Sequence, residues 1–235
     1  MHGTIPTKRF IPFTEELANL PGLISVFPLS RVVLLQGEVL PLHIFEPRYR
    51  AMVRDALDGN QVIGVVEYLA DPNASTAENP PLKPLGCIGY IAHHTELPDG
   101  RYLLWLLGLE RFTIDEEVAV DTSYRQVRVT YNPISESAEL LAGLQPVRTE
   151  LRQALPRLVD IDDDDRGILV EQLCEISDSQ LIALACQILE LPIGLKRRLL
   201  EADNQVDRLM LVVEELYRHL DEHPGAGGDL PETLN

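Results

Sequence analysis

The sequence predicts an α+β fold in two consecutive parts, a strand-rich region at residues 23–132 and a helical region at residues 133–220. Up to about Tyr131, apolar residues come in short runs or alternate with polar ones, which is typical of strands. After Asn132-Pro133 they recur with a period near 3.6, which is typical of helices. Residues 1–22 are expected to form an N-terminal extension. Residues 221–235 are expected to form a flexible tail, because they are rich in Gly and Pro and poor in apolar residues.

Seven strands are expected in the first region, and one helix interrupts them. The strands are Ile24 to Phe27, Val32 to Leu35, Val39 to Ile44, Val62 to Tyr68, Cys87 to Ala92, Tyr102 to Leu107 and Tyr124 to Tyr131. Pro47 suits the first position of the helix, where its missing N–H would be unpaired in any case. Apolar residues then follow at helical spacing until Asp58-Gly59-Asn60 ends the run.

The helical region is expected to form a small bundle. A first helix is expected from Ser137 to Leu158, with Pro146 kinking or splitting it, and a second from Arg166 to Cys174. Ser177-Asp178-Ser179-Gln180 has the form of a capping box and predicts the start of a third helix. A short helix after Pro192 and a longer one from Gln205, with a continuous apolar stripe, complete the bundle.

Composition restricts the possible partners and the compartment. The formal net charge of −17 disfavours both nucleic acid and an anionic membrane surface. No apolar run approaches the roughly 18 to 20 residues that span a bilayer, and no signal peptide is recognisable. Cys87, Cys174 and Cys186 form no close pair, which fits a reducing compartment. We therefore expect a cytoplasmic protein with no nucleic-acid or membrane partner.

Three blocks of sequence carry a family resemblance. The first runs from Phe27-Pro28-Leu29 to Leu40-Pro41-Leu42-His43-Ile44-Phe45-Glu46-Pro47-Arg48-Tyr49. The second, Gly86 to Phe112, contains Leu97-Pro98-Asp99-Gly100-Arg101-Tyr102 and Gly108-Leu109-Glu110-Arg111-Phe112. The third is the helical run from Leu189 to Leu216. In this order the blocks resemble the N-terminal, substrate-binding domain of the ATP-dependent Lon protease, of the bacterial type. The resemblance implies a β pseudobarrel similar to the PUA fold, followed by a helical subdomain.

The resemblance implies binding rather than cleavage. The sequence contains no G-x-x-x-x-G-K-[ST] motif, and nothing in it resembles the Ser–Lys peptidase domain of Lon. The chain thus looks like a stand-alone, non-catalytic member of the family that needs no cofactor or metal and binds polypeptide clients or a protease partner. The matched blocks supply the candidate binding residues, which are His43, Glu46, Arg48, Tyr49, Asp99, Arg101 and Arg111.

Other readings stay open beside this one. His43, Glu46 and Arg48 could form the corner of a small hydrolase or ligand-binding enzyme, although no G-x-S-x-G elbow occurs; structurally, Glu46 could instead cap the following helix. The chain could also be an adaptor for a separate ATP-dependent protease.

Three further features bear on binding. Open strand edges would suit β-augmentation, and the loop at residues 71–84 and the turn from Leu97 to Arg101 could form a mobile rim or be plain surface loops. Trp105 lies in an apolar run and is expected in the core. The acidic run at residues 160–165 is expected to be a solvated turn rather than a calcium loop.

Overall fold

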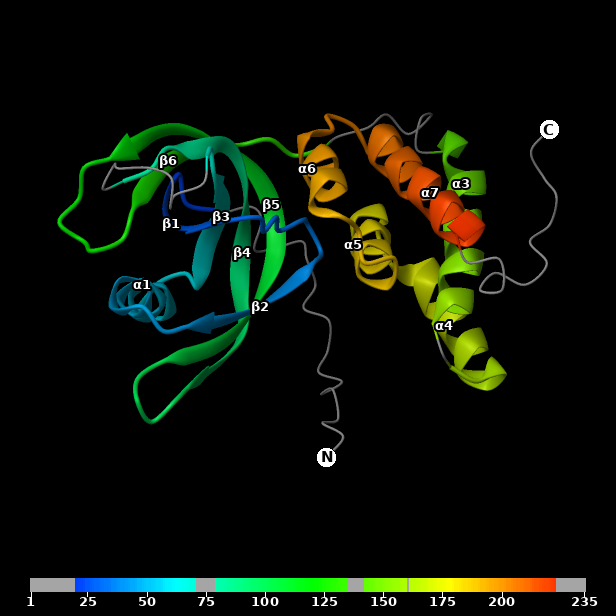
Figure 1. Ribbon diagram of the computed structural model, residues 1–235, viewed down its shortest axis with the longest axis horizontal. Coiled ribbons are helices and arrows are strands. Elements are labelled where there is room, and N and C mark those ends of the chain that lie inside the picture. Colours follow the sequence, from blue (N-terminus) through cyan, green and yellow to red (C-terminus); the bar gives the residue numbers. More distant parts are fainter. Residues whose placement is uncertain (1–19, 71–78, 135–141, 160, 223–235) are drawn as a thin grey trace.

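The computed structural model describes residues 20–70, 79–134, 142–159 and 161–222, and these form an α+β fold. A strand-rich half and a helical half lie side by side (Figure 1). The strands are β1 (Leu23–Leu29), β2 (Val39–Ile44), β3 (Val62–Tyr68), β4 (Leu82–Glu96), β5 (Tyr102–Val118) and β6 (Gln126–Tyr131), with helix α1 (Pro47–Asp58) between β2 and β3. The expected α+β architecture is confirmed.

The sheet closes on itself through its longest strand, β5. Its order is β2-β5-β4-β3-β1-β6, and β6 pairs again with β5. The first part of β5 pairs with β2, from Tyr102 to Leu107, whereas the second part, from Phe112 to Val118, pairs with β6. Strands β5, β4, β3, β1 and β6 therefore close into a barrel, and β2 is attached outside it at the open end of the sheet.

The strand expected at Val32 to Leu35 is absent, because that segment lies between two cores instead of in the sheet. Leu34 packs into the core of the strand-rich half, whereas Val33 and Leu35 pack among the helices. The Leu35 N–H donates to the Glu38 carboxylate at 3.1 Å. This side chain therefore takes the place of the main-chain carbonyl that a neighbouring strand would supply. The apolar run Val32 to Leu35 is therefore buried from two sides, which explains its apolar character without a strand.

Gly108 allows this segment to approach the barrel. A Cβ atom at Gly108 would lie 2.1 Å from the Leu35 carbonyl oxygen, which is closer than any side chain tolerates. The Gly37 N–H donates to the Gly108 carbonyl oxygen at 2.8 Å, and Gly37 itself has a positive φ of 82°. The strand predicted from the sequence ended at Leu107, but β5 continues through this glycine to Val118.

The helical half is a small bundle, as expected. Its elements are α3 (Gln145–Ala154), the 3-10 turn η3 (Leu155–Leu158), α4 (Asp163–Glu175), α5 (Asp178–Ile188), α6 (Ile193–Glu201) and α7 (Gln205–Glu222). Pro146 lies in the first turn of α3, where a missing N–H costs nothing, while residues 137–141 of the expected first helix lie outside the described residues. The capping box is present, with Ser177 and Gln180 bonding reciprocally at the start of α5.

Two remaining expectations concern the acidic run and the membrane. The expected turn is wrong for Asp163 to Asp165, which begin α4, and the Asp162 side chain accepts the Asp165 N–H at 2.8 Å and caps that helix. No cluster among the described residues could hold a metal ion. Within the same residues, no helix combines the length and the apolar character needed to cross a bilayer.

Candidate functional site

The corner formed by His43, Glu46 and Arg48 is an exposed strand-to-helix junction. Arg48 donates from Nε to the Glu46 carboxylate at 3.0 Å, so the expected capping of α1 by the Glu46 side chain is wrong. The main-chain carbonyl of Glu46 instead accepts the N–H groups of Tyr49 and Arg50. The His43 ring lies 6.0 Å from that of Phe45 and is exposed. In this arrangement the carboxylate is paired with an arginine and is not held as a base beside the imidazole.

Tyr49 is a core residue. It is buried, its ring meets that of Phe27 edge-on at 4.4 Å, and the Arg48 guanidinium lies 4.5 Å from its ring centre. Burial raises the pKa of its hydroxyl, which disfavours ionisation. Tyr49 therefore anchors α1 and is not available to a ligand.

Asp99 and Arg101 pair with each other in the turn between β4 and β5. The Arg101 N–H and Nε donate to the two Asp99 carboxylate oxygens at 3.1 and 2.6 Å, and the backbone bond first, then the side chain, lowers the pKa of Asp99. The turn is closed by bonds between Leu97 and Arg101 and between Leu97 and Gly100. This network holds the turn in one shape. Residues 71–78 of the other proposed rim segment lie outside the described residues.

Arg111 joins the two halves of the molecule. From β5 it donates to the carbonyl oxygens of Asn132 at 2.8 Å, Leu200 at 3.2 Å and Ala202 at 2.8 Å. It thereby satisfies carbonyls at the C-terminal end of α6 that lack intrahelical partners. The seven candidate residues thus fall into separate places, and Arg111 serves the contact between the two halves.

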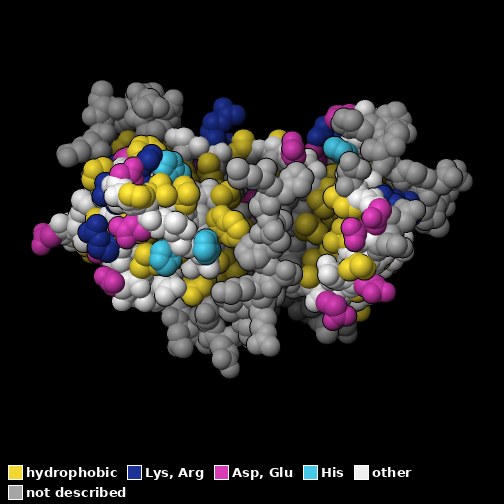
Figure 2. Space-filling model, turned by 90° about the horizontal axis from the view of Figure 1, so that it is seen from below, with side chains coloured by type: hydrophobic (Ala, Val, Ile, Leu, Met, Phe, Trp, Pro, Cys, Tyr) yellow, Lys and Arg dark blue, Asp and Glu magenta, His cyan; other side chains and the backbone are white. Residues whose placement is uncertain are grey.

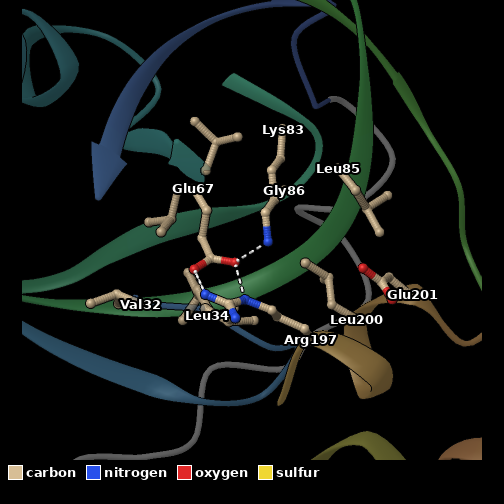
Figure 3. Close-up of a pocket in the computed structure, with 12 residues that line it drawn as sticks. Val32, Leu34, Glu67, Lys83, Leu85, Gly86, Arg197, Leu200 and Glu201 are labelled. Carbon is tan, nitrogen blue, oxygen red and sulfur yellow. Dashed lines mark hydrogen bonds and ion pairs between the residues drawn. The ribbon is translucent and has the colours of Figure 1, made fainter. Parts of the chain in front are cut away.

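A second set of charges on α6 completes this contact, which we call the α6 interface. Arg197 grips both carboxylate oxygens of Glu67 in β3 at 2.7 Å, and Lys83 in β4 donates to the same carboxylate at 2.9 Å (Figure 3). Lys196 of α6 donates from Nζ to one carboxylate oxygen of Glu38. The α6 interface therefore consists of Lys196, Arg197, Leu200 and Ala202 on one side and Glu38, Glu67, Lys83 and Arg111 on the other.

Both carboxylates of the α6 interface, those of Glu38 and Glu67, are paired with cations. Glu67 is only 6% exposed. Burial acts to raise its pKa, but the hydrogen bonds from Arg197 and Lys83 outweigh burial and lower it below the ordinary value. The cavity beside these residues, lined by Val32, Leu34 and Leu85 among others, has a volume of about 30 Å³. That is room for about one water molecule, so the cavity fits neither a peptide side chain nor a metabolite.

The outer surface of β2 and β5 differs from the charged α6 interface because its side chains are uncharged and exposed. It carries exposed side chains that come from alternate positions of neighbouring strands, so they point to one side of the sheet. We call it the β2–β5 face; it comprises Val39, Pro41, His43, Leu103 and Trp105, with His93 of β4 beside Trp105. Hydrophobic side chains gather around the histidines on the strand-rich half in Figure 2. None of these residues carries a carboxylate, an ammonium or a guanidinium group.

Trp105 was expected in the core, but it is 41% exposed. It lies opposite Pro41 on β2 and its ring centre is 5.6 Å from that of His93. The run Tyr102-Leu103-Leu104-Trp105-Leu106-Leu107 is apolar on both faces, which hides the alternation that would have separated inward from outward residues. The inward set is Tyr102, Leu104 and Leu106. Leu103 and Trp105 are apolar residues at outward positions of β5, beside the edge strand β2. This pattern could have indicated the exposed face from the sequence.

Comparison with known proteins decides the family. The model of the ATP-dependent protease La (LON) substrate-binding domain matches residues 24–218. The chain belongs to this family. It is 28% identical over 226 residues to Lon protease 2 of Myxococcus xanthus, covering 92% of this chain and 26% of that protein. It is 30% identical over 107 residues to the Lon protease of Flavobacterium johnsoniae, covering 45% of this chain and 13% of the relative.

Solved structures agree on the fold. The N-terminal domain of a Mycobacterium avium complex Lon protease superposes with a TM-score of 0.63 at 18% identity, covering 84% of this chain and all of that one. A Lon N-terminal domain protein from Xanthomonas campestris superposes with a TM-score of 0.55 at 22% identity, and the match covers 82% of this chain and 97% of that one. The chain spans about a quarter of the length of the Myxococcus relative. The family name therefore describes a substrate-binding domain and leaves the activity of the full-length relatives aside.

Proposed function

We propose that this chain is a non-catalytic module that binds unfolded or extended polypeptide through the β2–β5 face. The observation that carries the proposal is the group of exposed apolar residues on that face, with Leu103 at 45% and Trp105 at 41% exposure. Contiguous exposed apolar surface on a soluble protein marks an interaction site. The family, whose described role is substrate binding, supports the same assignment.

The chemistry of the face suits side chains that folded proteins keep inside. Trp105, Leu103 and Val39 offer apolar area, and no charge on the face would have to lose its water when an apolar segment binds. The phenylalanine that follows β2, Phe45, is 59% exposed and extends the apolar surface along the chain. Unfolded polypeptides expose such residues and native ones bury them, so the face distinguishes the two.

Trp105 provides the test because it is the only tryptophan in the chain. Titration with a reduced and alkylated, permanently unfolded protein of low net charge should shift its emission to shorter wavelength, whereas the same protein in its native fold should not. Leu103→Glu should weaken binding about tenfold, since a charge would then have to be buried in the complex.

Leu23→Glu is the matched control. Leu23 is 42% exposed but lies on β1, which pairs neither with β2 nor with β5. The β2–β5 face is not the binding surface if the Leu103 and Leu23 variants bind the unfolded protein with equal affinity. The same conclusion follows if the emission of Trp105 is unchanged at saturation.

The adaptor function is a finer version of the same proposal. An adaptor for a separate ATP-dependent protease would need a second surface for that protease. Cross-linking of a bound complex of the chain, an unfolded client and the protease would distinguish it from independent binding.

A further inference from the structure

The β2–β5 face ends at an open strand edge. Among the described residues β2 pairs with β5 alone and stands at the end of the sheet order. In Figure 1, β2 runs along the side of the sheet remote from β6. Its second edge therefore carries main-chain groups that no strand in the described part of the chain takes up.

The ladder shows which groups these are. The Gly108 N–H donates to the Glu38 carbonyl at 2.8 Å, so Glu38 turns its carbonyl toward β5. In an antiparallel pair this orientation alternates, so Leu40, Leu42 and Ile44 also face β5. Val39, Pro41 and His43 turn their main-chain groups outward. Pro41, which has no N–H, thus stands at a position where none is needed for the ladder, as proline in an edge strand does.

We propose that the outward edge of β2 binds an extended segment of another polypeptide as an added strand. The inference rests on the proposed function and names its mode. The edge offers the carbonyls of Val39, Pro41 and His43 and the N–H groups of Val39 and His43 to the incoming chain. Alternate side chains of that segment would then lie beside the β2–β5 face, and the others beside the half-buried Leu40 and Leu42. The partner is an uncharged segment of about six residues. At least every second residue of this segment, on the side of the β2–β5 face, is apolar.

A second copy of this chain fits the edge poorly. Two β2 strands related by a two-fold axis through their centre would set Pro41 opposite Pro41. Neither residue has an N–H to donate, so the middle of the ladder would lack both of its hydrogen bonds. A client with an N–H at every position keeps one of these two bonds, because it donates to the Pro41 carbonyl. Proline in an exposed edge is also a known means of preventing strands from pairing edge to edge.

Backbone methylation separates strand addition from binding by side chains alone. The probe is a peptide of about seven residues in which Phe alternates with Thr, long enough to span β2. In an added strand only every second N–H points at β2. Methylating the amide nitrogens of the Phe residues or of the Thr residues leaves the side chains unchanged but blocks one set of bonds.

The expected result is a strong difference between the two methylated peptides, measured by the emission of Trp105 in the full chain. One should bind about 30-fold or more weakly than the unmodified peptide, because two or three hydrogen bonds are lost, and the other about equally well. Loss with the Phe set indicates an antiparallel partner, and loss with the Thr set a parallel one.

Two results would overturn the inference. Equal binding of both methylated peptides would show that side chains alone hold the client, leaving the proposed function intact. A concentration-dependent dimer in sedimentation, dissociated by the unmodified peptide, would show that the edge belongs to a second copy. If neither the peptides nor the unfolded protein bind at all, the proposed function itself fails.

Discussion

The two surfaces that flank the barrel differ in almost every physical respect. At the α6 interface, buried charges meet partners from the other half of the molecule and the remaining space holds about one water molecule. On the β2–β5 face no residue is charged, and large apolar side chains remain exposed. Paired charges in a closed contact hold the molecule together, whereas the apolar side chains of the β2–β5 face stay exposed beside an edge of β2 that no described strand pairs. This difference supports the proposal that the first surface is structural and that the second binds polypeptide.

Replacing Arg111 tests the structural half of this comparison most severely. Arg111→Ala should lower the free energy of unfolding by about 3 kcal/mol, because the carbonyls of Asn132, Leu200 and Ala202 lose a charged donor. Urea denaturation followed by circular dichroism measures this. Arg128→Ala, which removes only an exposed pair with Glu116, should cost less than about 0.5 kcal/mol. Similar losses in the two variants would mean that Arg111 does not join the halves.

Replacing Glu67 tests the structural role of the α6 interface through the pH dependence of the free energy of unfolding. The folded state holds the pKa of Glu67 below the ordinary value of 4.5, so its ion pairs stabilise the fold above that value and the contribution is lost as pH falls below it. Glu67→Gln should cost about 1 to 2 kcal/mol at neutral pH and progressively less under acid.

Denaturation curves of wild type and variant between neutral pH and pH near 3 provide the measurement, and the gap between them should narrow toward acid. A gap that widened instead would mean that the carboxylate is destabilising in the folded state. In either case, peptide binding at neutral pH should be unchanged, because Glu67 lies outside the β2–β5 face.

The sequence predicted the architecture because the fold follows from periodicity. The change from a period of two to one of 3.6 near Asn132 separates strands from helices, and the Ser177–Gln180 box marks the start of α5. These are local signals, since neighbouring residues along the chain determine them. The family resemblance implied a barrel, but periodicity could not show that β5 closes it, because closure depends on which partner each part of this long strand meets.

The proposed binding surface was harder to predict, for a physical reason. Arg111 carries a charge and looks functional, but two of its partners lie some 90 residues away in the chain, and only the fold shows that it is paired. Trp105 looks like a core residue because residues 102–107 are apolar throughout, and only the fold shows that its side chain lies on the exposed face of the sheet. The strand predicted at Val32 to Leu35 was wrong for a related reason, because this apolar run is buried between two cores without joining the sheet.

Hydrogen–deuterium exchange of the full chain, with and without the unfolded client at saturation, shows directly whether β2 takes up the client. The main-chain amides of β2, above all Val39 and His43, should gain protection, while the amides of α6 exchange as before. Protection that appeared at α6 and left β2 unchanged would contradict this prediction.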